Sequence, residues 1–130
     1  MNLAVDSGNT YSKIGWFEGS ELVRVESRLT FDQLAKLVRS SPAEHIIYAS
    51  VGKTIEEFCD AIQPNASVLN LDSQTPLPIA KHYDTPATLG ADRIAAAVGA
   101  GFLYPREDLV VIDMGTCITY DYLDCNACFQ

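Results

Sequence analysis

The sequence has 130 residues, of which 48% are hydrophobic and 20% charged, and this ordinary globular composition argues against a disordered chain. The net charge of −8 would repel the phosphates of a nucleic acid, so a broad nucleic-acid surface is not expected. The N-terminus lacks the basic region of a signal peptide, and the longest weakly polar run, residues 94–104, is shorter than the roughly 18 residues that a membrane span needs.

The first thirty residues predict three strands joined by tight turns. Residues 3–5 form a short apolar run, residues 12–17 alternate in polarity after a turn-rich segment, and residues 21–28 follow a Glu-Gly-Ser turn. Three strands linked so early suggest an antiparallel meander rather than the βαβ opening of common nucleotide-binding folds.

Helices and strands alternate in the next forty residues. Thr30 and Thr54 are each placed to cap a helix whose apolar residues recur at helical spacing. Apolar runs at residues 45–51 and 68–71 predict two more strands. The predicted order of this part of the chain is therefore βββαβαβ.

The rest of the chain predicts a loop, a helix and two strands. Residues 72–88 are rich in Pro, Thr and Ser and indicate a surface loop. A long helix with many small residues is expected at 90–103, where small side chains permit close packing on a sheet or on a second copy of the helix. Strands are expected at 109–112 and 116–123.

One motif occurs twice. Val5-Asp6-Ser7-Gly8-Asn9-Thr10 recurs in outline as Ile112-Asp113-Met114-Gly115-Thr116, each time between an apolar strand and a second strand. A repeat of this kind is typical of duplicated lobes. We expect residues 1–105 to form a first lobe and residues 106–130 to be the opening hairpin of a second lobe that is not completed.

The first copy of the motif has the composition of a phosphate-binding hairpin. Gly8 lets the backbone approach a ligand closely, with the amide groups of the turn directed at phosphate oxygens. Thr10 and Ser12 add hydroxyl donors, Lys13 adds a movable positive charge, and Asp6 is placed to hold Mg²⁺ through water. The alternative is an ordinary hairpin turn, since turns favour Gly, Asn and Asp in any case.

Two other nucleotide-binding signatures are rejected. Gly52-Lys53-Thr54 resembles the end of a P-loop, but the first glycine of that motif would fall at Ile47. The sequence also lacks a Gly-x-Gly-x-x-Gly motif after an early strand.

The start of the predicted Ala-rich helix carries a second polar group. Asp92 and Arg93 would lie in its first turn, where a carboxylate is favourable and an arginine needs a partner or a ligand. Arg93 is able to clamp a substrate carboxylate, and Asp92 to accept a proton from a substrate hydroxyl. The alternative is a helix cap with a surface ion pair.

A Cys-x-x-Cys pair, Cys125 and Cys128, raises the possibility of a metal or redox site. The sequence offers no second pair, and His45 and His82 lie far upstream. We therefore expect reduced thiols in a cytoplasmic protein.

Three segments together resemble the type III pantothenate kinases in identity, order and spacing. They are Asp6-Ser7-Gly8-Asn9-Thr10 with Lys13, Thr88-Leu89-Gly90-Ala91-Asp92-Arg93, and Val111-Ile112-Asp113-Met114-Gly115-Thr116 with Thr119. The first and third segments occur across the actin-like kinases, whereas the Gly-Ala-Asp-Arg element is more specific.

This resemblance implies an α/β fold, in which a ribonuclease-H-like lobe with a mixed sheet begins an actin-like two-lobe kinase. It implies ATP-dependent phosphorylation of pantothenate to 4'-phosphopantothenate, the first step of coenzyme A synthesis. It also implies a homodimer whose active sites lie at the subunit interface, with no nucleic-acid or membrane partner.

The resemblance also implies roles for single residues. The residues expected to bind ATP are Asp6, Ser7, Gly8, Asn9, Thr10, Tyr11, Ser12, Lys13 and Thr116. Those expected to bind pantothenate are Tyr83, Gly90, Ala91, Asp92 and Arg93, with Asp92 as the proton acceptor. Asp113 is expected to bind a monovalent cation, K⁺ or NH₄⁺, beside the Mg²⁺ that accompanies ATP.

Two alternatives stay open on the same scaffold. One is a kinase for another small hydroxy substrate, and the other is a non-catalytic nucleotide-binding regulator. Because the kinases of this family continue into a complete second lobe, we expect the 130-residue chain to leave apolar faces and strand edges uncovered and to be inactive alone.

Overall fold

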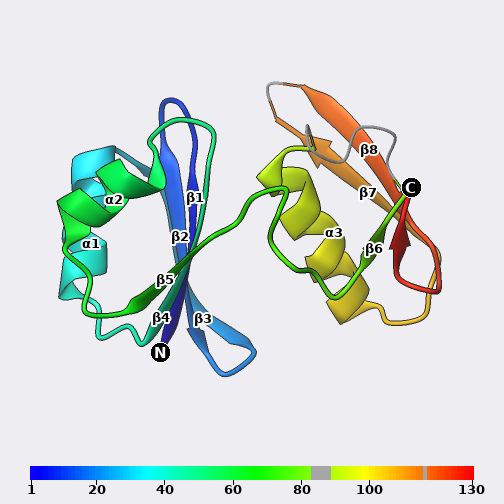
Figure 1. Cartoon of the computed structure of the whole chain (residues 1–130), viewed down its shortest axis with the longest axis horizontal. Coiled ribbons are helices and arrows are strands. Elements are labelled where there is room, and N and C mark those ends of the chain that lie inside the picture. The colour runs from blue at the N-terminus through cyan, green and yellow to red at the C-terminus, as the bar shows by residue number, and fades with distance from the viewer. Residues whose placement is uncertain (83–88, 116) are drawn as a thin grey trace. The chain divides into compact units, whose positions relative to one another are not determined.

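The computed structural model describes residues 1–82, 89–115 and 117–130. The chain forms two compact units, Met1–Leu71 and Asp72–Gln130. Each unit has one sheet that combines parallel and antiparallel pairs (Figure 1). Among the described residues, none of the helices has the length and apolar character needed to cross a bilayer.

The first unit contains a five-stranded sheet in the order β3-β2-β1-β4-β5. Its strands are β1 (Asn2–Ser7), β2 (Ser12–Glu18), β3 (Glu21–Leu29), β4 (His45–Ser50) and β5 (Ser67–Asn70). The first three strands pair antiparallel, as the predicted meander requires, and β4 pairs parallel with both β1 and β5.

Two capped helices cover one face of this sheet, α1 (Phe31–Ser40) and α2 (Ile55–Ile62) (Figure 1). Thr30 and Thr54 are their N-caps, as predicted, and each forms a capping box with the Gln or Glu three residues later. Such a cap stabilises a helix by about 1 kcal/mol.

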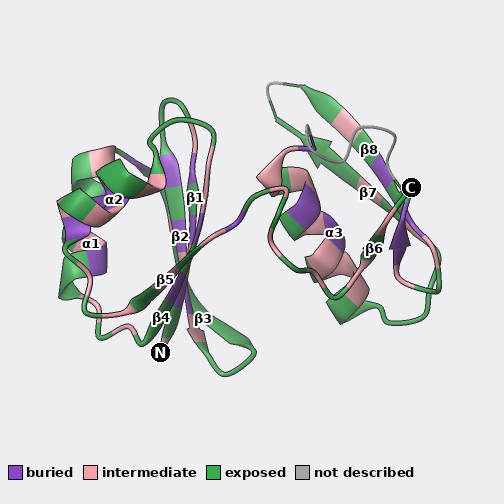
Figure 2. Cartoon of the chain, in the orientation of Figure 1, coloured by how far each residue is buried: buried purple, intermediate pink, exposed green. Residues whose placement is uncertain are grey.

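The core of the first unit lies between the helices and the sheet (Figure 2). Alternate residues of the central strands point to it, so Val5 and Ile14 are buried while Asp6 and Lys13 point to the opposite face. Tyr48 of β4 stacks on Phe58 of α2, with ring centroids 4.1 Å apart. This packing holds α2 against β4.

The second unit packs one helix, α3 (Ala91–Leu103), on a sheet in the order β6-β9-β8-β7. The strands are β6 (Ala80–Lys81), β7 (Leu109–Met114), β8 (Ile118–Leu123) and β9 (Cys128–Phe129). β7 and β8 form the second hairpin, in which Asp113 pairs with Thr119.

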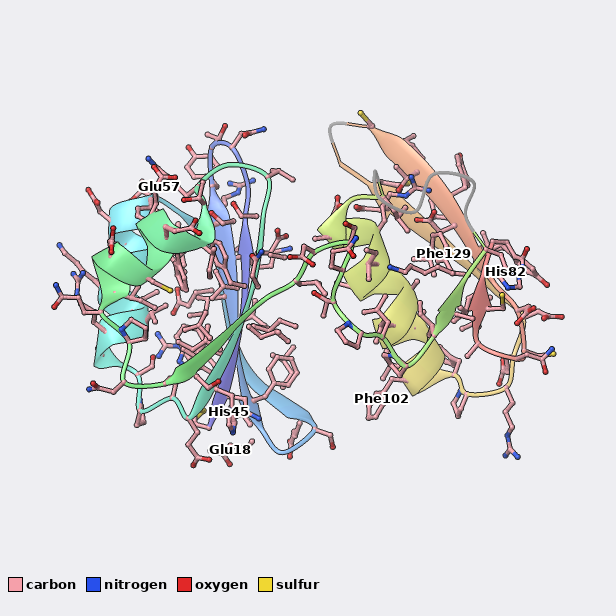
Figure 3. The ribbon with its side chains drawn as sticks, viewed as in Figure 1. Glu18, His45, Glu57, His82, Phe102 and Phe129 are labelled. Carbon is pink, nitrogen blue, oxygen red and sulfur yellow. The ribbon has the colours of Figure 1, made fainter. Side chains whose placement is uncertain are left out.

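Small residues let α3 approach the sheet closely. Ala97 is completely buried, and a Cβ built on Gly101 would lie 2.9 Å from a methyl carbon of Leu123 in β8. The small residues on this side of α3 therefore serve packing on the sheet, one of the two uses that the sequence suggested. In contrast, Phe102 at the end of the helix is 69% exposed (Figure 3).

The face of the β7–β8 hairpin that points away from α3 is apolar and exposed. Its members form three cross-strand pairs, Val110 with Tyr122, Ile112 with Tyr120, and Met114 with Ile118.

Two short strands depart from the prediction. The segment 72–88, expected to be a loop, contains β6, which pairs parallel with β9 at the end of the chain. Two-residue strands are too short to show a sequence period, because long-range pairing alone defines them. In addition, β8 begins at Ile118, two residues later than expected.

Candidate functional site

The first Asp-x-Gly motif forms a tight hairpin in which β1 ends at Ser7 and β2 begins at Ser12. The turn between them consists of Gly8, Asn9, Thr10 and Tyr11, and the amide of Gly8 donates to the carbonyl of Tyr11 at 3.1 Å. A Cβ on Gly8 would lie 2.8 Å from that same oxygen. The turn therefore requires glycine at its first position.

The polar side chains of this hairpin lie on two sides of the sheet. Ser7 and Ser12 point to the helix side, where both are buried and their hydroxyl oxygens are 3.3 Å apart. Asp6 and Lys13 are cross-strand neighbours on the opposite face, and both are exposed. The hairpin thus brings the predicted residues close together, but their side chains point to opposite faces of the sheet.

A cavity of about 260 Å³ lies on the helix side of the turn. Ser7, Gly8, Asn9, Thr10 and Ser12 line it, together with Phe31, Gly52, Lys53 and Glu57 from the starts of α1 and α2. Figure 3 shows Glu57 at the end of α2 that lies toward the hairpin turn. Hydroxyl groups, backbone amides and a lysine around one hollow suit an anion such as phosphate.

The loop after β4 lies against the β1–β2 hairpin. The amide of Val51 donates to the carbonyl of Ser7 at 3.1 Å, and a Cβ on Gly52 would lie 3.2 Å from the carbonyl oxygen of Gly8. Lys53 follows at once, with its ammonium 3.5 Å from Glu57 and 5.7 Å from the centre of the Phe31 ring. The sequence predicted no role for Lys53, although Gly-Lys-Thr before a capped helix was a visible signal.

The Glu57 carboxylate is a charged acceptor at the start of α2. The Thr54 amide donates to Glu57 Oε2 at 2.8 Å, and Lys53 adds a positive charge nearby. These two neighbours, the amide first, lower the pKa of Glu57 below its ordinary value. The Glu57 carboxylate therefore stays ionised to a lower pH than an ordinary glutamate.

A second cavity, of about 400 Å³, lies on the other side of the hairpin. Its charged lining residues are Asp6, Lys13 and Arg28. Arg28 has a positive φ of 57° near the end of β3, and no sequence motif indicated this residue as part of a site. One acidic and two basic side chains around one hollow suit a ligand that carries both phosphate and a cation.

In the second unit, the first turn of α3 carries the predicted substrate group. Gly90 is the N-cap and makes no side-chain cap hydrogen bond. The Asp92 carboxylate folds back toward it, since a Cβ on Gly90 would lie 2.5 Å from Asp92 Oδ1. Asp92 is exposed, while Ala91 beside it is half-buried. Asp92 is therefore accessible to a substrate at the start of the helix.

Arg93 is paired with an acid that the sequence did not reveal. Its Nε lies 3.1 Å from each carboxylate oxygen of Asp121 in β8, and its Nη2 also contacts Oδ1. Asp121 is only 4% exposed. The predicted surface ion pair at this helix start is thus a largely buried one, and its acidic member comes from the hairpin rather than from the helix.

The second Asp-x-Gly motif also forms a hairpin, and the amide of Gly115 donates to the carbonyl of Cys117 at 3.0 Å. Asp113 is exposed and lies on the same face of the hairpin as Thr119 and Asp121, the face toward α3. The hydroxyl of Thr119 is the only buried side-chain polar atom without a hydrogen-bond partner among the described residues.

Two predicted site residues, Tyr83 and Thr116, lie outside the described residues. For the cations, no cluster of three acidic, histidine or cysteine side chains occurs within the described part of the chain. Single exposed carboxylates such as Asp6 and Asp113 fit ions that keep most of their other ligands from water or phosphate. All four cysteines are free thiols, with Cys128 buried and Cys125 exposed.

The sequence comparisons with known proteins agree on one family. The sequence model described as type III pantothenate kinase matches residues 2–130. A type III pantothenate kinase of Phocaeicola vulgatus is 40% identical over 100% of this chain and 55% of its own length. The corresponding protein of Bacteroides fragilis is 42% identical over 95% of this chain and 52% of its own. The chain therefore spans about half the length of the curated relatives it matches.

Two solved structures resemble the fold of this chain. One, from Campylobacter jejuni, is described as a Baf family transcriptional activator, with a TM-score of 0.57 and 25% identity over 98% of this chain and 50% of its own. The other is the Aquifex aeolicus member of the Ppx/GppA family, with a TM-score of 0.51 and 13% identity over 99% of this chain and 48% of its own. The second likeness concerns the fold alone.

Proposed function

This chain belongs to the type III pantothenate kinase family, and from that premise we propose that it acts in the ATP-dependent phosphorylation of pantothenate. The product is 4'-phosphopantothenate, and the reaction is the first step of coenzyme A synthesis. The observation that carries the proposal is that two residues lie next to one another in the first turn of α3: Asp92, which is exposed, and Arg93, whose guanidinium is held by Asp121.

We propose that the first hairpin binds the phosphates of ATP. Its turn offers backbone amides and hydroxyl groups around the 260 Å³ cavity, and glycine at position 8 permits a close approach. Lys13 and Lys53 supply positive charge on the two sides of the hairpin. By resemblance, Thr116 of the second hairpin also contacts ATP.

Pantothenate is assigned to the start of α3. Arg93 would hold the pantothenate carboxylate, because a guanidinium forms two parallel hydrogen bonds with such a group. Asp92 would orient the attacking hydroxyl and accept its proton. Phosphoryl transfer depends mostly on positioning and charge stabilisation, so orientation by Asp92 matters at least as much as its basicity. Gly90, Ala91 and Tyr83 complete the assigned substrate contacts.

Two cations belong to the proposal. Mg²⁺ would accompany ATP, held through water by Asp6 and supplying positive charge to the transferred phosphoryl group. A monovalent cation, K⁺ or NH₄⁺, would bind at Asp113. The Thr119 hydroxyl, which lacks a partner among the described residues and lies across from Asp113, supports an oxygen-liganded site there.

For the complete protein we propose the actin-like arrangement. By resemblance, residues 1–105 would form the ribonuclease-H-like first lobe, and residues 106–130 would begin the second lobe. In the structure of this chain, α3 instead packs on β7 and β8 within the unit Asp72–Gln130. The two Asp-x-Gly hairpins support this division, because in each the first strand has Asp as its next-to-last residue. The family resemblance further supports a homodimer with shared active sites, and the four free thiols fit a cytoplasmic location.

A non-catalytic nucleotide-binding regulator is the second candidate, favoured by the likeness to the Baf family protein. The acid and the paired arginine at the start of α3 favour the kinase, since a regulator would need neither. A kinase for another small hydroxy substrate is the third candidate.

The test compares turnover of ATP by the complete protein with pantothenate, a sugar and a small hydroxy acid. A kinase for pantothenate turns over only with pantothenate. ATP at about 100 times its dissociation constant should raise the free energy of unfolding by about 2.7 kcal/mol, whichever of the three candidate functions is correct. Stabilisation without any turnover would support the regulator, and turnover with another substrate alone would support the third candidate.

A further inference from the structure

The buried acid at position 121 raises a question that its sequence position does not answer. Asp121 lies in β8 on the face of the hairpin that points toward α3. The next residue on that face, Leu123, is 2% exposed. A carboxylate in such surroundings is costly unless it is paired and hydrogen-bonded. Arg93 meets that need from the first turn of α3, 28 residues earlier in the chain.

Stability alone is a weak reason for such a pair. A buried ion pair contributes little compared with apolar residues of the same volume, so its retention favours a role in geometry. The position of Arg93 is itself unfavourable, because the start of a helix repels a positive charge. Asp121 removes that penalty and fixes the direction of the guanidinium at the same time.

Asp121 accepts hydrogen bonds from Nε and Nη2 of the planar guanidinium and so fixes the direction of its plane. The Arg93 side chain remains 24% exposed, in contrast to 3% for Asp121. The arginine is therefore anchored from the inside and still reachable from the solvent, beside the exposed Asp92.

We propose that Asp121 is a positioning residue for the substrate carboxylate, acting through Arg93. This inference rests on the proposed function, since the carboxylate is that of pantothenate. Asp121 would hold the guanidinium plane in the direction that a carboxylate ligand requires before the ligand arrives. Binding then avoids the entropy of ordering a long side chain, and the substrate hydroxyl is brought to Asp92.

The experiment uses the complete protein and two substrates, pantothenate and its neutral alcohol analogue, in which CH₂OH replaces the carboxylate. Asp121→Asn keeps the shape of the side chain and removes its charge. We expect kcat/KM for pantothenate to fall about 10- to 100-fold, while that for the alcohol changes less than about 3-fold. The KM for ATP should be unchanged. A general loss of structure would instead alter the kinetics with ATP, pantothenate and the alcohol together.

Two further variants make the result decisive. Asp124→Asn removes the same charge nearby, where Asp124 Oδ1 accepts the amides of Asn126 and Cys128, and it should keep the preference for the acid. If Asp121→Asn does not fold, Asp121→Glu decides, because a carboxylate displaced by one methylene should raise KM for pantothenate and spare the alcohol.

The outcomes separate the inference from the function on which it rests. A folded Asp121→Asn or Asp121→Glu protein that still prefers pantothenate over the alcohol as strongly as the wild type overturns the positioning role alone. A wild-type protein that phosphorylates neither compound overturns the proposed function and this inference with it.

Discussion

The Asp92 carboxylate occupies the space beside Gly90 in which a β-carbon would stand. A Cβ on Gly90 would lie 2.5 Å from Asp92 Oδ1, and the nearest carbon of that carboxylate is 3.7 Å away. The clash is with the end of a flexible side chain rather than with the backbone. A side chain at position 90 would therefore move Asp92 more than it would disturb the fold.

Gly90→Ala should separate activity from stability. We expect kcat with pantothenate to fall about 10- to 100-fold because the proton acceptor is displaced, while the melting temperature changes little. Steady-state kinetics and thermal unfolding measure the two effects. Gly99→Ala, in the same helix, is the matched control, since nothing lies within 4 Å of its Cβ. It should stabilise the helix by about 1 kcal/mol and leave kcat unchanged.

Gly8→Ala should weaken nucleotide binding through the backbone. The new methyl would meet the Tyr11 carbonyl at 2.8 Å, and neither group is free to rotate away. We expect a loss of about 1–3 kcal/mol in unfolding free energy and a clear loss of ATP affinity by calorimetry. Gly19→Asn serves as the control, because Gly19 has a φ of 58° that asparagine tolerates. Equal ATP affinity in Gly8→Ala and the wild type would contradict a role for this turn.

Lys53→Met tests the helix-side cavity. The substitution removes the ammonium, which lies 5.7 Å from the centre of the Phe31 ring, and should lower ATP affinity several-fold at low salt. The difference should shrink as ionic strength rises, because the exposed charge is screened. Lys36→Met, on the exposed side of α1, controls for the change in net charge. An affinity that does not respond to Lys53→Met would show that phosphate is bound elsewhere on the hairpin.

How far the sequence predicts this molecule depends on the range of each signal. The caps at Thr30 and Thr54 act over three residues, so both helices were predictable. The tight turn at Gly8 follows from a local motif and was predictable in the same way. The role of Asp121 was not predicted. An acid in a strand of alternating polarity is expected to face solvent, and only the packing of α3 places Arg93 beside it.

The short strands β6 and β9 were missed for a related reason. They are defined by pairing of Ala80 with Cys128 and Lys81 with Phe129, and no local pattern encodes such a contact. Arg28 likewise lines a cavity from a left-handed conformation near the end of β3, which no local motif indicated. What local chemistry specifies was predictable, and what long-range pairing specifies was not.

The stability of α2 should depend on pH through Glu57. Because the pKa of Glu57 is lower in the folded state than in the unfolded chain, its contribution is present above the ordinary glutamate pKa. That contribution is lost as the pH falls through the lowered value. Titration of the Glu57 carboxyl by NMR should give a pKa below the ordinary one. In Glu57→Gln, unfolding should depend less on pH in this range, whereas Glu56→Gln should retain the wild-type slope.

The most direct test of the central claim is phosphorylation of pantothenate from ATP by the complete protein, with and without K⁺, beside Asp92→Asn. Asp32→Asn is the matched control, because Asp32 holds the same position in the first turn of α1 as Asp92 does in α3. We predict K⁺-dependent turnover that collapses in Asp92→Asn and persists in Asp32→Asn. Turnover that survives in Asp92→Asn, or a wild-type protein that binds ATP without transferring phosphate to pantothenate, would contradict the account.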